Sequence, residues 1–354
     1  MNKKTALYKQ IQFQIRDKIM SGKLRPADRI PSEQELMDEY KVSKITVKNA
    51  LTELADEGLI VRIQGKGTFV AADVPQTGIP PFGSPSAQAA PLIGLIIPTL
   101  KTGVIRKLVD HTELFLKEAG FQMILSITRE SAAEESRAIR DLVDAGVQGL
   151  IVFPTEDEKY NESLLRLSLD KFPFVFIDRY LRNIETYTIT SDNLGGAYDT
   201  VSYLLEKGHR HIALLSPENA NTAVQDRTTG FEKAYIDREI SIDKNLWCHV
   251  PLDILRSDRA LDYITEFWGG HPAITAAFTL TEEIAQLTSQ ALRRTRREKD
   301  VELISFDDPG IPNVSYVQQD EREMARSAVS LLCEQIKSAY APQNVVVPVK
   351  LVFR

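Results

Sequence analysis

Cysteine is scarce in this sequence, and long hydrophobic runs are absent. The 354 residues include two cysteines, Cys248 and Cys333, which are too few and too far apart for a disulfide framework or a four-ligand metal site. The longest apolar stretches, such as residues 92–97, have the length of a strand, whereas a membrane helix needs about 20 apolar residues. We therefore expect no disulfide-stabilised fold, no metal and no membrane span.

Motifs of common enzymes are also missing. There is no G-x-S-x-G elbow, no G-x-x-x-x-G-K-[ST] phosphate loop and no G-x-G-x-x-G dinucleotide fingerprint. His209 and His211 have no cysteine or carboxylate at ligand spacing, which favours a structural role at the start of a strand. No apolar block follows the basic N-terminus, so we expect no signal peptide. These absences predict a cytoplasmic protein that has no cofactor and is not an enzyme.

The charge is divided unevenly along the chain. Residues 1–72 contain 13 Lys and Arg against 9 Asp and Glu, a net charge of +4. The remaining 282 residues contain 30 against 40, a net charge of −10. A small basic segment attached to an acidic body is typical of a module that meets a polyanion such as nucleic acid.

A proline-rich stretch separates these two parts. Residues 73–91 contain five prolines and show neither a helical nor a strand-like hydrophobic period. We interpret this stretch as a linker between an N-terminal domain of residues 1–72 and a body of residues 92–354. The body is long enough to form two lobes.

The N-terminal domain has the pattern of three helices and a hairpin. Apolar residues recur at every fourth position of the first helix, at Leu7, Ile11, Ile15 and Ile19. Ser32 and Glu35 have the spacing of a capping box for a second helix, and Ser43 can cap a third. Two strand-like runs, 59–63 and 68–71, flank a glycine-rich turn. Together these elements predict a winged helix-turn-helix.

The third predicted helix presents polar side chains outward. Its apolar positions face inward and are Val47, Ala50, Leu51 and Leu54. Lys44, Lys48 and Asn49 then lie on the opposite side. Because the start of such a helix enters the major groove, these side chains can reach base edges or phosphates. Lys66, between two glycines of the hairpin turn, can supply charge to a phosphate or the minor groove.

The same residues resemble the winged-helix head of GntR-family transcription regulators. The matching segments are PSEQEL at 31–36, VSKITV at 42–47 and QGKGTFV at 64–70. The resemblance implies DNA contacts from Ser32, Glu33, Ser43, Lys44, Thr46, Lys48, Asn49, Gln64, Gly65, Lys66 and Gly67. The family usually has arginine at the positions of Lys44 and Lys48, and lysine lacks the bidentate fork of arginine.

The body alternates apolar strand-like runs with helix-length amphipathic segments. The strand-like runs are residues 92–98, 121–127, 149–153, 174–178, 211–216, 273–279 and 301–306. The amphipathic segments include residues 104–119, 132–145, 195–207 and 257–268. This alternation predicts parallel sheets covered on both faces, so the expected class is α/β with two lobes.

The body resembles the effector domain of LacI-type repressors, which has the two-lobed, type I periplasmic-binding-protein-like fold. The matching segments are IGLIIP at 93–98, FIDR at 176–179, GHRHIA at 208–213 and ISFDD at 304–308. The resemblance implies a ligand between the lobes, which agrees with the general rule that ligands bind at the carboxyl ends of parallel strands. A GntR-type head on a LacI-type body is similar to AraR-type arabinose repressors.

The LacI-type pattern also implies a polar set for a sugar. The implied ligand-binding residues are Asp178, Arg179, Arg227, Glu282 and Asp307. Carboxylate and guanidinium groups can pair with adjacent hydroxyls in bidentate fashion. An interlobe or surface salt bridge is the alternative role for Arg227 and Asp307. Glu282 follows Thr281 where the family pattern has Asn-Asp, which indicates a change in a usual polyol contact.

These patterns predict a ligand-responsive transcription regulator. We expect a repressor of sugar-utilisation genes that binds a pseudo-palindromic DNA operator as a homodimer and is released by a sugar such as arabinose. The alternative is a sugar-binding module or a sugar-metabolising enzyme with an accessory nucleic-acid-binding head. Operator binding and substrate turnover discriminate between the two.

Overall fold

The chain divides into two units in the computed structural model, Met1–Ala89 and Ala90–Arg354. The structure describes residues 7–63, 66–71, 90–155, 161–182, 184–218, 221–337 and 340–354. Residues 72–89, which make up most of the predicted linker, lie outside the described residues. No helix in the described part of the chain is long and apolar enough to cross a membrane.

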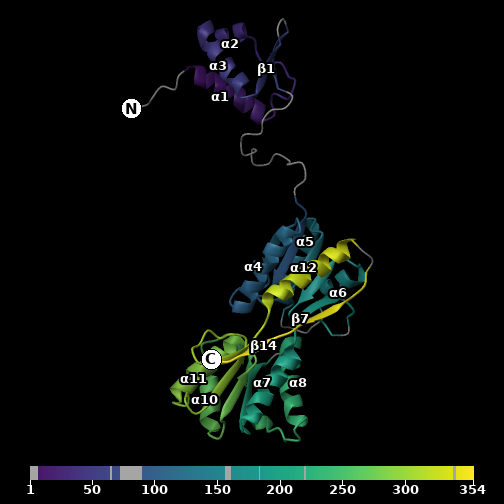
Figure 1. The fold of residues 1–354 in the computed structure, drawn as a ribbon, viewed down its shortest axis with the longest axis vertical. Helices are drawn as coiled ribbons and strands as arrows, with labels where there is room; N and C mark the ends of the chain where they lie inside the picture. Colours follow the sequence, from purple (N-terminus) through teal and green to yellow (C-terminus); the bar gives the residue numbers. More distant parts are fainter. Residues whose placement is uncertain are drawn as a thin grey trace. The chain divides into compact units, whose positions relative to one another are not determined.

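Three helices and an antiparallel hairpin form the N-terminal unit, as the sequence predicts (Figure 1). The elements are α1 (Leu7–Met20), α2 (Glu33–Tyr40), α3 (Lys44–Asp56), β1 (Ile60–Ile63) and β2 (Gly67–Val70). Ile11, Ile15 and Ile19 of α1 pack into one core with the apolar sides of α2 and α3. Leu7 departs from its prediction, because it begins α1 one turn beyond this core and is 52% exposed.

Side-chain caps determine where α2 and α3 begin. The Glu35 amide donates to Ser32 Oγ at 3.3 Å, and the Ser32 amide donates to Glu35 Oε2 at 2.7 Å. This reciprocal pair is the predicted capping box. The Thr46 amide donates to Ser43 Oγ at 3.4 Å and caps α3. Between the helices Lys41 has a φ of 51°, which turns the chain sharply, and the helix-turn-helix prediction is confirmed.

Each lobe of the body contains one six-stranded sheet. The first lobe has the order β13-β7-β6-β5-β3-β4, with bounds Asn344–Val347, Tyr187–Ser191, Phe174–Ile177, Gly149–Val152, Leu92–Ile97 and Gln122–Ile127. The second has the order β14-β12-β11-β10-β8-β9, with bounds Lys350–Val352, Ser315–Gln318, Glu302–Phe306, Ala276–Thr279, Ile212–Glu218 and Trp247–Pro251. All seven predicted strand-like runs form strands.

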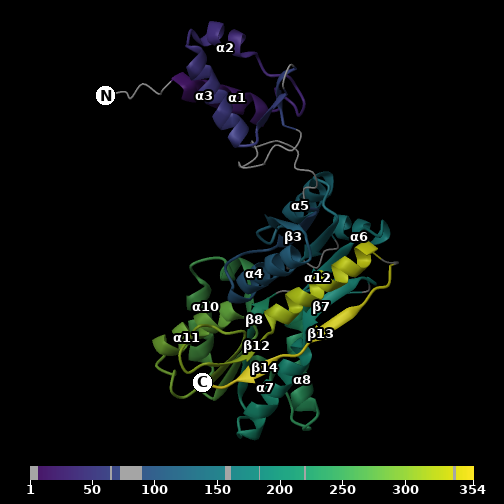
Figure 2. The ribbon, with the colours of Figure 1, turned by 45° about the horizontal axis from the view of Figure 1, so that its top comes forward.

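Helices cover both faces of each sheet (Figures 1 and 2). In the first lobe they are α4 (Gly103–Glu118) and α12 (Glu321–Lys337) on one face, α5 (Ala132–Asp144) and α6 (Glu162–Leu169) on the other. In the second lobe they are α7 (Asn193–Glu206) and α8 (Thr222–Ile236) on one face, α10 (Ala260–Gly270) and α11 (Glu282–Arg294) on the other. Short segments η1 (Lys244–Leu246) and α9 (Leu252–Leu255) flank β9. This arrangement explains the continuous apolar strands, which are buried from both sides.

The chain crosses between the lobes three times. The crossings are β7 to α7, β12 to α12 and β13 to β14. Each crossing leaves a strand at its C-terminal end. The C-terminal ends of the strands of both sheets therefore face the space between the lobes. At the third crossing the chain enters the second sheet from that carboxyl edge, and β14 therefore runs antiparallel to β12. This pairing corrects the prediction of wholly parallel sheets.

Candidate DNA-binding surface and ligand cleft

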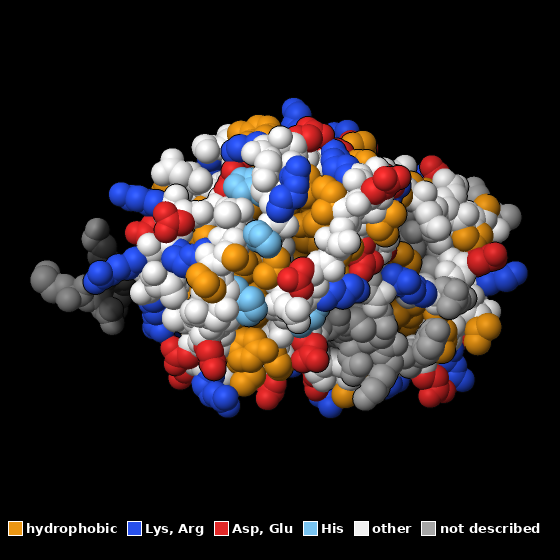
Figure 3. Space-filling model, turned by 90° about the horizontal axis from the view of Figure 1, so that it is seen from below, with side chains coloured by type: hydrophobic (Ala, Val, Ile, Leu, Met, Phe, Trp, Pro, Cys, Tyr) orange, Lys and Arg blue, Asp and Glu red, His pale blue; other side chains and the backbone are white. Residues whose placement is uncertain are grey.

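The outer side of α3 carries the polar side chains that were expected to contact DNA. Lys44, Lys48 and Asn49 are exposed, while the four predicted inward positions of the same helix are buried. Lys66, where the chain enters β2, is also exposed. On the face of the protein drawn in Figure 3, by contrast, acidic, basic and hydrophobic side chains are interspersed. The exposed side of α3 is therefore a suitable surface for a polyanion.

Several of the predicted DNA-binding residues also hold the head together. The hydroxyls of Ser43 and Thr46 lie 2.9 Å apart at the start of α3, and Ser32 caps α2, in which Glu33 is the first residue. Gly67 has a φ of 120°, and a Cβ there would lie 3.1 Å from Arg29 Nε. Of the remaining predicted contacts, Gln64 and Gly65 lie outside the described residues.

In the body, two aspartates occupy equivalent places in the two lobes. Asp178 follows β6 and Asp307 follows β11, and each of these strands is third in the order of its sheet. Both residues are buried, and both have left-handed backbones, with φ of 70° and 76°. Aspartate tolerates this conformation better than most side chains. Each lobe thus places one of these buried aspartates at the C-terminal ends of its strands.

Arg227, on α8, interacts electrostatically with both of these carboxylates. Its side chain is 4% exposed, and Nη1 lies 3.6 Å from Asp307 Oδ2. Nε donates to Asn193 Oδ1 at 2.8 Å, and Nη1 donates to the Leu280 carbonyl at 2.6 Å. The guanidinium also lies over the Phe306 ring, 3.6 Å from its centroid. The two residues do form an ion pair, but it is buried within the second lobe and is therefore neither the interlobe nor the surface salt bridge that was considered as the alternative.

Close packing of α8 on α7 positions Arg227. Gly230 lies one turn after the arginine, and a Cβ there would be 2.3 Å from the Leu194 carbonyl oxygen. Without a side chain at this point α8 approaches the start of α7, where Asn193 accepts the hydrogen bond from Arg227. The Gly230-Phe231 pair that follows Arg227 in the sequence therefore has a structural reason.

Burial controls the protonation of this cluster. It raises the pKa of Asp307 to about 6, although the charge of Arg227 and a hydrogen bond from Gln319 act in the opposite direction. Burial also raises the pKa of Asp178, against the charges of Arg227 and Arg179. In the described part of the chain no hydrogen bond to the Asp178 carboxylate is present. A ligand with hydroxyl donors can supply the hydrogen bonds that these carboxylates need.

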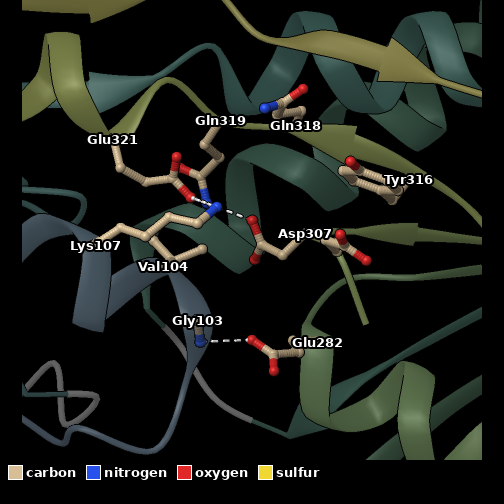
Figure 4. Close-up of a pocket in the computed structure, with 10 residues that line it drawn as sticks. Gly103, Val104, Lys107, Glu282, Asp307, Tyr316, Gln318, Gln319 and Glu321 are labelled. Carbon is tan, nitrogen blue, oxygen red and sulfur yellow. Dashed lines mark hydrogen bonds and ion pairs between the residues drawn. The ribbon is translucent and has the colours of Figure 1, made fainter. Parts of the chain in front are cut away.

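A small cavity lies beside Asp307, between the lobes (Figure 4). Its lining residues are Gly103, Val104, Lys107, Glu282, Asp307, Asp308, Tyr316, Gln318, Gln319 and Glu321. Within it Gln319 Nε2 donates to Asp307 Oδ1 at 2.6 Å, and Lys107 Nζ lies 3.0 Å from Glu321 Oε1.

Direct contacts join the lobes on both sides of the cleft. On one side the Gly103 amide, at the start of α4, donates to Glu282 Oε2 at 2.8 Å. On the other side the Tyr180 amide donates to Thr222 Oγ1 at 3.1 Å, and Arg182 lies 3.7 Å from Asp226. Thr102, the residue before α4, makes no side-chain cap. Glu282 of the second lobe therefore caps a helix of the first.

The predicted sugar-binding residues are thus divided among three places. Asp178, Arg227 and Asp307 form the buried cluster. Glu282 lies in the wall of the cavity that Asp307 also lines. Arg179 turns to its own lobe, where it donates to the Pro154 carbonyl at 3.1 Å and lies 4.9 Å from the centroid of the Phe153 ring.

Sequence reasoning missed two amides that contact this cluster, Asn193 and Gln319. Each lies at a lobe crossing: Asn193 begins α7, two residues after β7, and Gln319 directly follows β12. Asp192-Asn193 matches the LacI-type pattern, but neither strand was among the predicted runs, and neither amide was predicted as a site residue.

Each unit matches a known family model over part of its length. Residues 7–70 match the bacterial regulatory proteins of the gntR family, and residues 201–354 match the periplasmic binding protein-like domain.

Similarity to individual proteins extends over nearly the whole chain. An arabinose metabolism transcriptional repressor of Halalkalibacterium halodurans is 28% identical over 98% of this chain and 95% of its own length. A repressor of the same name from Geobacillus stearothermophilus is 25% identical over 93% and 91%. Among solved structures, a complex of the transcriptional regulator CelR with cellobiose covers 89% of this chain and 91% of its own, with 20% identity and a TM-score of 0.67.

Proposed function

Because the chain combines a GntR-type helix-turn-helix head with a periplasmic-binding-protein-like body, we propose that it is a transcriptional repressor of sugar-utilisation genes. A sugar such as arabinose binds between the lobes and releases the protein from its operator. The observation that carries this proposal is the buried Asp178–Arg227–Asp307 cluster in a chain whose head presents Lys44, Lys48 and Asn49. A repressor acts on chromosomal DNA, so its place of action is the cytoplasm.

The DNA partner is a pseudo-palindromic operator bound by a homodimer. One recognition helix reads only a short half-site, so two heads are needed for a specific operator. Lys44, Lys48 and Asn49 contact bases or phosphates, and Lys66 contacts the backbone from the wing. The protein works by binding and not by turnover, as its relatives that are named repressors do.

The sugar partner is recognised by hydroxyl groups that meet the buried charges. Asp178 and Asp307 accept hydrogen bonds, and the guanidinium of Arg227, which the second lobe holds in place, interacts electrostatically with both. Such charge-assisted hydrogen bonds are about twice as strong as neutral ones. Glu282 completes the proposed set from the cavity wall, and Arg179 contributes through its charge near Asp178.

One assay tests the whole proposal. A DNA sequence is selected from a random library with the full chain, and its binding is followed by fluorescence anisotropy with and without a panel of monosaccharides that includes arabinose. We expect one sugar to weaken binding by about 10-fold or more, since coupling energies are typically about 1–3 kcal/mol. The K48A variant should bind the selected DNA more weakly.

Two aspartate variants give the matched control. D178N keeps the size of the side chain and suits the positive φ, but it removes the charge that accepts sugar hydroxyls. It should bind DNA normally and no longer respond to the sugar. D237N makes the same change at an exposed residue that pairs with Lys233 and should behave as the unaltered protein. Failure to select any DNA, or a sugar response that D178N retains, would contradict the proposal.

A further inference from the structure

One side chain on the outer face of α3 does not suit a solvated helix. Ile45, the second residue of α3, is 72% exposed, the highest value among the large hydrophobic side chains described in the head. Isoleucine is β-branched and has a lower helix propensity than alanine or lysine. At this position it gains no packing in the head to offset that cost.

The charges around Ile45 also work against the helix. The first turn of α3 contains no acidic residue and begins with Lys44, although the positive end of the helix dipole favours acidic side chains. Lys48 and Asn49 lie three and four residues further on, so they are the neighbours of Ile45 on the helix surface. Lys41, in the preceding turn, is exposed as well. The start of α3 is therefore destabilised at the point where the head exposes an apolar side chain among cationic ones.

This combination limits what can cover Ile45. A second copy of the head would bring its own lysines against these, and like charges at a contact are repulsive. A polyanion that carries an isolated apolar group suits both the charge and the side chain. In the major groove of DNA the C5-methyl group of thymine is the apolar group on the base-pair edges.

We propose that Ile45 determines operator specificity by packing against the methyl group of one thymine in each half-site. The inference rests on the proposed function, because it requires that α3 enters the major groove. It adds an apolar readout to the polar contacts of Lys44, Lys48 and Asn49. Since Asn can pair with adenine in bidentate fashion, the two neighbouring side chains together favour an A·T-rich step.

The test replaces thymidine by deoxyuridine, which differs from it only in lacking the C5-methyl group. In the DNA selected with the full chain, each thymine is exchanged in turn, and affinity is measured for the unaltered protein and for I45A. At one position in each half-site deoxyuridine should weaken binding of the unaltered protein by about fourfold, the effect of one buried methyl group. I45A should bind thymine and deoxyuridine at that position equally well.

A matched variant controls for the loss of an exposed apolar side chain. F13A removes Phe13, which is 67% exposed on α1, and it should retain the fourfold preference for thymine. The inference is wrong if no position discriminates thymine from deoxyuridine, or if I45A retains the preference. It is also wrong if I45A changes the oligomeric state instead. If no DNA is selected at all, the proposed function fails first, and this inference fails with it.

Discussion

Asp307 makes the stability of the body depend on pH. Burial raises its pKa from 3.8 to about 6, so the folded protein binds this proton more tightly than the unfolded chain does. The carboxyl group therefore stabilises the fold while it is protonated, and the free energy of unfolding falls as the pH rises from about 4 to about 6. A ligand that donates hydrogen bonds to the ionised form offsets this loss.

Comparison with D307N isolates this titration. The asparagine does not titrate, so the stability of wild type relative to D307N should fall by roughly 1–3 kcal/mol between pH 4 and pH 7. Urea unfolding of both proteins across this range measures the difference. A difference that is constant with pH would show that Asp307 is ionised throughout.

The members of the buried cluster were implied by the resemblance to LacI-type repressors. Asp178 and Asp307 also stand at the ends of apolar strand-like runs, where ligands of parallel sheets are expected, and Arg227 precedes the matching Gly230-Phe231 pair. Ile45 was not predicted as a site residue. The helical period of Val47, Ala50, Leu51 and Leu54 already placed position 45 outside the buried side, but apolar residues were considered only as core.

At the scale of elements, α4 depends on the other lobe for its N-terminal cap. The Gly103 amide donates to Glu282 at 2.8 Å, and a cap is worth about 1 kcal/mol. In E282A the amide of Gly103 should therefore exchange with solvent about fivefold faster, because the first turn of α4 opens more often. Hydrogen exchange of the full chain, resolved at the start of α4, measures this rate.

The adjacent glutamate gives the control. E283A removes the same charge from the same turn of α11 and should leave the exchange of the Gly103 amide unchanged. Equal protection in E282A and in the unaltered protein would mean that this contact does not hold the lobes together in solution.

The elements that sequence reasoning missed are those defined by distant partners. β7, with the sequence YTITS, contains four hydroxyl side chains and becomes fully buried only between β6 and β13. β14 is three residues long, and its antiparallel direction follows from the crossing that precedes it. The resemblance implies a ligand contact for Glu282, and nothing in its own segment indicates that it also caps a helix end 179 residues earlier in the chain. Periodicity within a segment does not contain this information.

At the scale of the whole molecule, the proposed function places the control of DNA binding in the arrangement of two heads. We propose that ligand binding closes the cleft about the three crossings, shifts the paired bodies and changes the spacing of the heads relative to the half-sites. The predicted linker lacks a helical period, so it is not expected to act as a rigid lever. Sugar should therefore lower the operator affinity of the intact dimer.

The isolated head provides the decisive comparison. Residues 1–72 contain the DNA-binding elements but no cleft, so their weak binding to the selected DNA should not change at saturating sugar. Anisotropy titrations of both proteins, with and without the sugar, test this. A head that responds alone would exclude transmission through dimer geometry.

The three crossings also set the order in which a ribosome can complete the parts of this protein. The head, residues 7–71, is finished first and can fold while the rest is still being translated. The first lobe begins at Leu92 but needs α12 and β13, so it waits until Val347 has emerged. The second lobe begins later yet has all but one strand of its sheet by Gln318. During synthesis the head, to which we assign DNA binding, therefore exists before the lobes to which we assign its control.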